Sequence, residues 1–196
     1  MIAIVSYDAG NVLSIINALA RLGVEDWELT SDAKRLALAD KVILPGVGDA
    51  SVALASLRSL GLDSAIRSLT CPVLGICVGM QVLCRHCEEG DAEGLGVFRA
   101  DVSRFSPGDP ELKIPHMGWN QVHQMRTPLF EEVPSGAYMY YVHSYRAGLC
   151  PDTIAQTTHG EPFSAALSNG NFYGTQFHPE KSGSFGARVL KNFLEL

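Results

Sequence analysis

The chain has 196 residues, of which 46% are hydrophobic and 18% charged, the composition of an ordinary globular protein rather than a disordered or fibrous one. Fifteen Lys and Arg against 21 Asp and Glu leave a net charge of -6, which argues against a nucleic-acid partner because phosphate-backbone binding needs clustered cations. No apolar run approaches the ~18 residues of a membrane span and no signal peptide precedes Ile2, so we expect a cytoplasmic protein without membrane association.

The first half of the chain alternates short apolar runs with helical patterns. A strand is expected near Ile2–Ser6, followed by a helix over Asn11–Leu22, where apolar residues recur at helical spacing. Lys41–Pro45 and Pro72–Ile76 indicate buried strands, and Ser51–Leu60 indicates a helix between them. This alternation predicts an α/β fold with a central, mostly parallel sheet flanked by helices, in a single domain over residues 1–196.

From about residue 94 onward the pattern changes to closely spaced strand candidates separated by Pro, Gly and Asn, which is typical of antiparallel hairpins. Phe163–Ser168 and Phe172–Phe177 flank Asn169-Gly170, where two residues of positive φ would favour a type I′ turn. The second strand runs into His178-Pro179-Glu180, and Ala187–Leu194 predicts a closing helix. The second half is therefore expected to be β-rich and antiparallel.

The segment Gly75-Ile76-Cys77-Val78-Gly79 lies between a predicted strand and a helical stretch, the context of a nucleophile elbow with sulfur in place of oxygen. Glycines allow the sharp turn that would present Cys77 at the carboxyl end of the sheet. The N-terminus of the following helix would favour a thiolate. The alternative is a buried cysteine that acts as a small hydrophobic residue.

A thiol nucleophile needs a base, and the base needs a group that orients its ring. His178 and Glu180 suit these roles, because Pro179 favours an extended backbone in which residues two apart point to the same side. Alone, this tripeptide is more often a surface turn. Its place after a strand, in a chain with a cysteine elbow, favours the catalytic interpretation.

Acyl transfer also needs two donors for the developing oxyanion. The N–H of Val78 is one candidate, and the loop Pro45-Gly46-Val47-Gly48, which ends a strand at the same sheet edge, offers Val47 and Gly48 for the second. A glycine loop that merely turns the chain is the alternative.

The two motifs together, Gly-Ile-Cys-Val-Gly-Met-Gln at 75–81 and Thr-Gln-Phe-His-Pro-Glu at 175–180, resemble the triad (class I) glutamine amidotransferases, a family with a flavodoxin-like α/β fold. The resemblance covers nearly the whole chain. It implies that Cys77 attacks the side-chain amide of glutamine, that His178 protonates the departing ammonia and that Glu180 holds His178 in place. It further implies, without any cofactor, that the amino-acid end of glutamine is bound by Gln81, Glu89 and backbone groups of Ser144 and Tyr145. For Glu89 the alternative is a solvated charge at a helix end.

Further segments resemble one branch of that family, the glutaminase subunits that pass ammonia to a cyclase in histidine biosynthesis. They are Ser6–Asn11, Leu44–Gly48, Ile114–Asn120, Tyr141–Tyr145 and His178–Ser182. The resemblance implies a heterodimer with a cyclase subunit, which would be contacted by His116, Trp119, Asn120, Tyr140 and Lys181. Core packing is the alternative for Trp119.

Five cysteines without regular spacing do not suggest a disulfide framework. Cys84 and Cys87 form a C-x-x-C pair, but a structural zinc site needs four ligands and no second pair stands at a suitable distance, so we expect no metal and two thiols on a helix. Three other functions stay open: another glutaminase, such as that of pyridoxal phosphate synthesis, which should lack Pro115–Asn120; a cysteine peptidase on a related fold; and a non-catalytic binding module.

Overall fold

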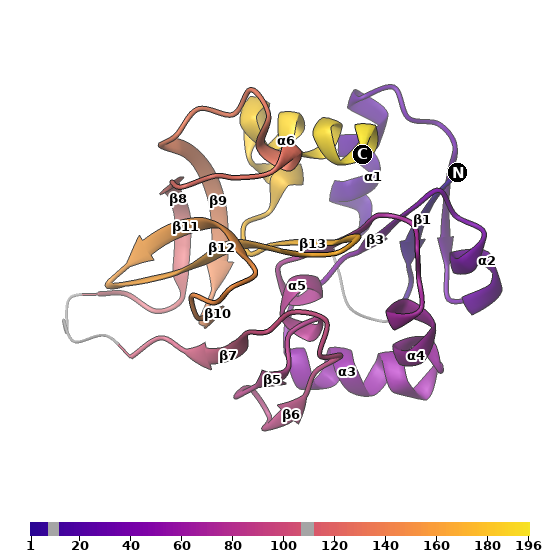
Figure 1. Ribbon diagram of the computed structural model, residues 1–196, viewed down its shortest axis with the longest axis horizontal. Coiled ribbons are helices and arrows are strands. Elements are labelled where there is room, and N and C mark those ends of the chain that lie inside the picture. Colours follow the sequence, from indigo (N-terminus) through magenta and orange to yellow (C-terminus); the bar gives the residue numbers. More distant parts are fainter. Residues whose placement is uncertain (8–11, 107–111) are drawn as a thin grey trace.

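A computed structural model describes residues 1–7, 12–106 and 112–196 of the chain (Figure 1). Asn11, where the first helix was predicted to begin, and most of the Ser6–Asn11 segment lie outside the described residues. The first described helix is α1, Val12–Arg21.

A seven-stranded mixed sheet runs through the centre of the protein in the order β11-β12-β13-β4-β3-β1-β2. Neighbours from β13 to β2 pair in parallel, and β12 and β11 are added antiparallel at one edge. The expected fold class is thereby confirmed. The strands are β1 (Ile2–Val5), β2 (Trp27–Thr30), β3 (Lys41–Leu44), β4 (Val73–Ile76), β11 (Thr153–His159), β12 (Glu161–Asn169) and β13 (Phe172–Thr175).

Helices cover both faces of this sheet, which is why β1 and β4 are buried along their whole length. Helices α1 and α6 (Gly183–Glu195) pack on one face, and α3 (Ala50–Ser59), α4 (Leu62–Arg67) and α5 (Val78–Val82) on the other (Figure 1). The short α2 (Ala33–Ala37) contacts α4 and β1 (Figure 1). Among the described residues, no helix combines the length and apolarity needed to span a bilayer.

The second half is rich in strands, as the sequence predicted, and two smaller sheets accompany the central one. An antiparallel pair is formed by β8 (His116–Val122) and β9 (Ala137–His143). Four short strands form a further sheet in the order β10-β7-β5-β6: β5 (His86–Cys87), β6 (Ala92–Glu93), β7 (Asp101–Arg104) and β10 (Tyr145–Ala147). This sheet contains a parallel pair, β5 with β7, beside its antiparallel pairs. Two single-turn 3₁₀ helices, η1 (Pro128–Phe130) and η2 (Pro179–Lys181), complete the elements.

The hairpin between β12 and β13 forms as expected, but its turn differs from the predicted one. Asn169 pairs with Phe172, so the turn is centred on Gly170 and Asn171. Of these two only Gly170 has a positive φ, 59°, a pattern that fits a type II′ turn better than type I′. The Asn171 side chain instead donates to the carbonyls of Leu69 and Cys71.

The prediction of two helix-borne thiols at Cys84 and Cys87 was wrong. Helix α5 ends at Val82, so Cys84 follows it in a bend and Cys87 lies in strand β5. Gly94 packs directly on the carbonyl of Cys84, where a Cβ would lie 2.0 Å from the oxygen. Helix α6 also begins earlier than the predicted Ala187.

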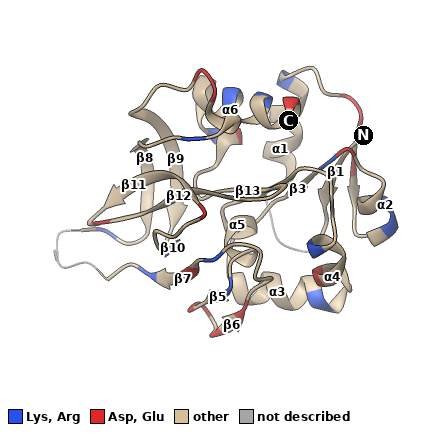
Figure 2. Ribbon diagram, viewed as in Figure 1, with Lys and Arg blue, Asp and Glu red and all other residues tan. Residues whose placement is uncertain are grey.

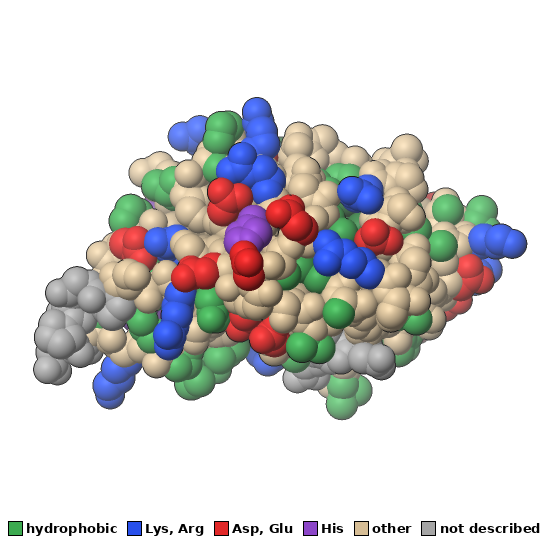
Figure 3. Space-filling view, turned by 90° about the horizontal axis from the view of Figure 1, so that it is seen from below, with side chains coloured by type: hydrophobic (Ala, Val, Ile, Leu, Met, Phe, Trp, Pro, Cys, Tyr) green, Lys and Arg blue, Asp and Glu red, His purple; other side chains and the backbone are tan. Residues whose placement is uncertain are grey.

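Charged residues lie mainly in the helices, the loops and the outer strands (Figure 2). On the face seen from below, basic side chains alternate with acidic ones that surround a histidine (Figure 3). His86 Nε2 and Asp91 Oδ1, an exposed pair, lie 2.9 Å apart. The described residues of this face form no continuous basic surface that would suit a phosphate backbone (Figure 3).

Candidate active site

Cys77 stands at the sharp turn between β4 and α5, in a backbone conformation rare for any residue but glycine, with φ 54° and ψ -109°. Close packing of two glycines makes the turn feasible. A Cβ on Gly79 would lie 2.0 Å from the carbonyl oxygen of Leu44, and one on Gly75 would lie 2.6 Å from that of Gly79. The predicted elbow is therefore present, and it is pressed against the end of β3.

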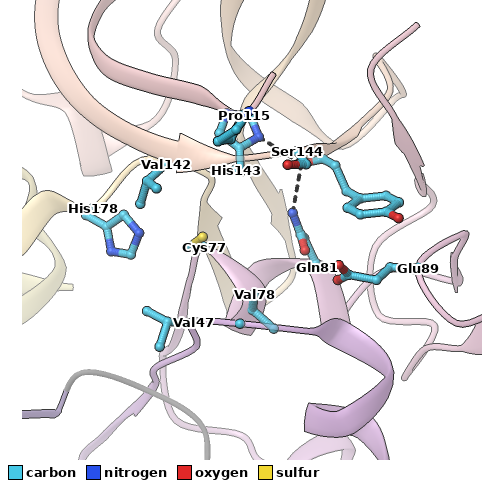
Figure 4. A pocket seen from close by; sticks show the side chains of 12 residues that line it. Val47, Cys77, Val78, Gln81, Glu89, Pro115, Val142, His143, Ser144 and His178 are labelled. Carbon is cyan, nitrogen blue, oxygen red and sulfur yellow. Dashed lines mark hydrogen bonds between the residues drawn. The ribbon is translucent and has the colours of Figure 1, made fainter. Parts of the chain in front are cut away.

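His178 lies beside Cys77 in the same pocket (Figure 4). Its backbone is extended, as expected, with φ -95° and ψ 96°. Glu180, however, lies in the 3₁₀ turn η2, and this turn rather than an extended segment brings the carboxylate back to the ring. His178 Nδ1 and Glu180 Oε1 are 2.8 Å apart, and both side chains are almost completely buried.

The charged form of His178 is favoured in this setting. Burial alone would lower the pKa of the imidazole, but interactions with Cys77 and Glu180 outweigh it and raise the pKa to about 10. Glu180 binds Nδ1 of the ring. Nε2 has no hydrogen-bond partner among the described residues and is therefore available to interact with the sulfur of Cys77. The arrangement suits an imidazolium beside a thiolate.

A cavity of about 280 Å³ opens above the elbow and collects most of the residues expected to bind substrate. Its wall is shared by the end of β3, the elbow and the segment that joins β9 to β10 (Figure 4). The lining residues are Val47, Gly48, Cys77, Val78, Gln81, Glu89, Pro115, Val142, His143, Ser144, Tyr145 and His178.

The loop that carries Val47 and Gly48 lies directly against the elbow. A Cβ on Gly46 would approach the backbone nitrogen of Gly79 to 2.3 Å, so the two segments touch at backbone level. Gly48 has a φ of 94°, which other residues rarely adopt. The buried hydroxyl of Tyr7 donates to the carbonyl of Pro45 and fixes the start of this loop. Val47 and Gly48 of this loop thus line the same cavity as Cys77 and Val78.

Gln81 and Glu89 occupy the opposite end of the cavity (Figure 4). Gln81 Nε2 donates to the carbonyl oxygen of Tyr145 at 3.0 Å. Glu89 accepts from the backbone N–H of Ala50 at 2.8 Å, and burial raises its pKa above the ordinary value. Glu89 is thus a partly buried pocket residue in a turn after β5, and not a solvated charge at a helix end.

The residues expected at a partner surface do not all face outward. Trp119 is 55% exposed, whereas Asn120, Tyr140 and Lys181 are partly buried. His116 is buried, 4% exposed, so the side chain expected to meet a partner points inward. The alternation of β8 explains this, since Met117 and Trp119 take the outer face and His116 the inner one.

Inside the protein, His116 belongs to a hydrogen-bonded series that ends at the pocket. Its Nδ1 lies 2.9 Å from His143 Nε2, and its Nε2 lies 3.1 Å from Asn120 Nδ2. His143 Nδ1 donates at 2.7 Å to the carbonyl oxygen of Tyr145, the same oxygen that Gln81 contacts. Burial lowers the pKa of His116 to about 4 and that of His143 to about 3, so both rings are neutral.

Sequence reasoning missed Gln176, the buried residue that precedes Phe177. Its Nε2 lies 3.7 Å from Cys77 Sγ, and its Oε1 accepts from Gln81. A signal was available, because Gln176 stands two residues before His178 where an extended chain sends both side chains to the same side. In the described part of the chain, no group of three or more His, Cys, Asp or Glu is placed to hold a metal ion.

Comparison with known proteins places the chain in a family and supports its fold. The family model for class-I glutamine amidotransferases matches residues 4–196, and the chain belongs to this family. Solved structures of a glutamine amidotransferase (TM-score 0.76, 19% identity) and of PurLQS from Thermotoga maritima (TM-score 0.72, 20% identity) each match 99% of this chain and 97% of their own, and support the fold.

More similar relatives carry a more specific name. The imidazole glycerol phosphate synthase subunit HisH of Bacteroides thetaiotaomicron is 51% identical over 195 residues, which cover 100% of this chain and 99% of the relative. The protein of the same name from Escherichia coli strain K12 is 46% identical over 197 residues, with the same coverage.

Proposed function

We propose that this chain is the glutaminase subunit of an imidazole glycerol phosphate synthase, and that residues 1–196 act as one glutamine amidotransferase domain in the cytoplasm. Identity of 51% along the full length of a HisH subunit supports the biosynthetic assignment. The observation that carries the chemistry is the buried Glu180–His178 pair beside Cys77. Cys77 itself has a strained backbone conformation and lines the cavity.

In the proposed reaction Cys77 Sγ, as a thiolate, attacks the side-chain amide carbon of glutamine, and the C–N bond breaks as His178 transfers a proton to the departing ammonia. A water molecule then gives a proton back to His178 and attacks the thioester, which releases glutamate and restores the thiolate. Backbone N–H groups of Val78 and of the Val47–Gly48 loop would stabilise the oxyanion formed in each step. Glu180 keeps the imidazole oriented throughout.

The pocket has the polarity that the amino-acid end of glutamine requires. A carboxylate at Glu89 would hold the α-ammonium group, whereas backbone groups at Ser144 and Tyr145 and the Gln81 amide would place the remainder. All four residues line one cavity with Cys77, so the scissile amide and the sulfur would be held together.

Ammonia is useful to a synthase only if it arrives unprotonated, which favours direct transfer within a heterodimer. The cyclase partner would use it to form imidazole glycerol phosphate and AICAR from the ribulosyl nucleotide intermediate PRFAR. The outer face of the β8–β9 sheet, with Met117, Trp119 and Tyr138 more than half exposed, suits a docked protein. The Tyr140 ring connects this face to the site, with its centroid 6.0 Å from Trp119 and 6.5 Å from His178.

A glutaminase that worked without its partner would waste glutamine, so the free subunit should hydrolyse glutamine very slowly. Binding of the cyclase and its nucleotide substrate would shift the Gly46–Gly48 loop toward a catalytically competent conformation. Equal turnover with and without the cyclase would contradict this expectation. The glycine at 48, with its positive φ, provides the conformational freedom for such a shift.

The decisive experiment treats the protein with a glutamine-derived electrophile, maps the modified thiol by mass spectrometry, and measures glutamate release with and without a cyclase subunit. Labelling at Cys77, with turnover lowered by several orders of magnitude in Cys77→Ala and His178→Ala, is expected because triad members act as one unit. Retained activity in either variant would refute the mechanism. Cleavage of peptides without glutamine turnover would indicate a peptidase instead.

A further inference from the structure

Gln176 is the side chain that joins Cys77 to the substrate end of the pocket. It is completely buried just after β13, where its own backbone N–H donates to the carbonyl of Ala165 at 2.8 Å. Its side-chain amide spans two residues, with Nε2 3.7 Å from Cys77 Sγ and Oε1 3.1 Å from Gln81 Nε2. No function was expected of this residue from the sequence motif.

The hydrogen-bond network determines which end of the Gln176 amide faces the sulfur. The carbonyl oxygen of Tyr145 can only accept, so the Gln81 atom 3.0 Å from it must be the NH₂ group. The Gln176 atom that meets this NH₂ must then be the acceptor, its carbonyl oxygen. By elimination, the NH₂ group of Gln176 is directed at Cys77.

An N–H donor directed at sulfur stabilises a thiolate more than a thiol, and a fully buried site increases the effect because water does not screen it. We propose that Gln176 is a further catalytic residue of the glutaminase reaction, whose amide donates to the sulfur of Cys77 and stabilises its negative charge. The sulfur is anionic both as the attacking group in thioester formation and as the leaving group in thioester hydrolysis. One donor would therefore assist both steps.

This inference rests on the proposed function of Cys77, and it also gives Gln81 a second role. Gln81 touches the Tyr145 carbonyl and the Gln176 oxygen with the same nitrogen, so it aligns the donor as well as the pocket wall. Two titratable groups among the described residues, His178 and Tyr7, interact with the charge of Cys77. Neither group is changed in the variants below.

Two substitutions separate the donor from the acceptor. Gln176→Met keeps the approximate shape and removes both groups, whereas Gln176→Glu keeps an oxygen for Gln81 and removes the amide donor. In the complex with the cyclase subunit, both variants should lower kcat for glutamine hydrolysis about 10- to 100-fold, the value of a hydrogen bond to a charged group, with KM for glutamine changed less than about threefold. Gln156→Met, in β11 of the same sheet and outside the pocket, is the matched control and should behave as the wild type.

The second readout is the rate of Cys77 alkylation by iodoacetamide as a function of pH, which needs neither glutamine nor the cyclase. Its midpoint should move upward by on the order of one pH unit in Gln176→Met, since the thiolate loses a donor. An unchanged midpoint and unchanged kcat in folded variants would overturn the role of Gln176. If instead the wild type itself fails to release glutamate with the cyclase, the proposed function fails, and the alkylation midpoint still decides whether Gln176 donates to the sulfur.

Discussion

At the scale of single residues, the site depends on groups that are held in conformations they would not adopt alone. Cys77 keeps a positive φ because Gly75 and Gly79 pack too closely for the turn to relax. His178 keeps a single ring orientation because Glu180 accepts from Nδ1 inside the protein. The sulfur and Nε2 are therefore placed before substrate arrives, which lowers the entropic cost of the reaction.

Replacing Glu180 by Gln tests how much of this placement depends on charge. The amide oxygen can still accept from Nδ1, but the negative charge that helps to raise the pKa of His178 is lost. Turnover should fall, yet by roughly 10- to 100-fold less than in Cys77→Ala, because orientation is only part of the base's role. The measurement is kcat at saturating glutamine with the cyclase present, and a loss as large as that of Cys77→Ala would contradict the expectation.

At the scale of elements, the elbow is a contact between backbones. Strand β3 and helix α5 approach so closely that Gly79 faces the carbonyl of Leu44 with no room for a methyl group. Because atoms of the main chain cannot rotate away as a side chain can, a larger residue must push the two elements apart. The position of Cys77 at the sheet edge is thus coupled to the packing of α5 on β3.

Gly79→Ala should therefore destabilise the fold by ~3 kcal/mol, since a backbone shift is the only relief. Gly148→Ala is the control: a Cβ there meets nothing within 4 Å and its φ is not positive, so stability should be unchanged or slightly greater. Urea unfolding of the two variants measures the difference. Equal midpoints would show that the elbow tolerates a Cβ.

The β8–β9 sheet also contains two buried, neutral histidines in contact with each other, His116 and His143. Burial is the main cause that lowers the pKa of His116 to about 4 and that of His143 to about 3. His159 adds to the effect for His116, and His116, His159 and His178 add to it for His143. Unfolded histidines titrate near 6.5, so between that pH and about 4 the unfolded chain binds more protons than the folded one. The stability contributed by these rings is present above pH 6.5 and is lost as pH falls.

For each histidine, the free energy of unfolding should fall by about 1.4 kcal/mol for every pH unit of acidification over this range. Urea titrations at several pH values from 7.5 to 4.5 measure the slope, and His143→Gln should reduce it by removing one titrating ring. An identical slope in the variant and the wild type would show that these histidines do not control the acid sensitivity.

At the scale of the whole molecule, the exposed apolar side chains of the β8–β9 sheet are connected through ring contacts to His178. Trp119 packs edge-on against Tyr140, which in turn lies beside His178, and the backbone N–H of His178 donates to the carbonyl of Tyr140 at 2.9 Å. A protein docked on this face would thus sit two rings from His178, where the proposed reaction would release ammonia.

Trp119→Ala should weaken binding of the cyclase subunit about 30-fold, as expected for an aromatic anchor that contributes ~2 kcal/mol, and should leave the fold intact because the ring is mostly exposed. Leu149→Ala removes an apolar side chain of similar exposure outside this face and serves as the control. Isothermal titration calorimetry with the cyclase measures both, and equal affinities would place the partner elsewhere.

The linear pattern of residues was sufficient for the α/β fold class, most strand and helix positions and the elbow, because these depend on hydrophobic periodicity and on glycine at fixed spacings. The approach of His178 and Glu180 to Cys77 also followed, since parallel strands carry their carboxyl ends to one edge of the sheet. The alternation of the two faces along β8 also follows from the sequence. It places His116 on the buried face, although His116 was expected at the partner surface.

Tertiary structure alone decided the rest. Contacts between residues far apart in the chain decided three features. Glu180 reaches His178 through a 3₁₀ turn and not an extended segment, Cys84 and Cys87 do not continue a helix, and the amide of Gln176 faces the sulfur. Gln176 meets Cys77 across 99 positions, and Gln81 across 95. Local propensity carries no information about such pairs, because their energy exists only once the sheet has brought the segments together.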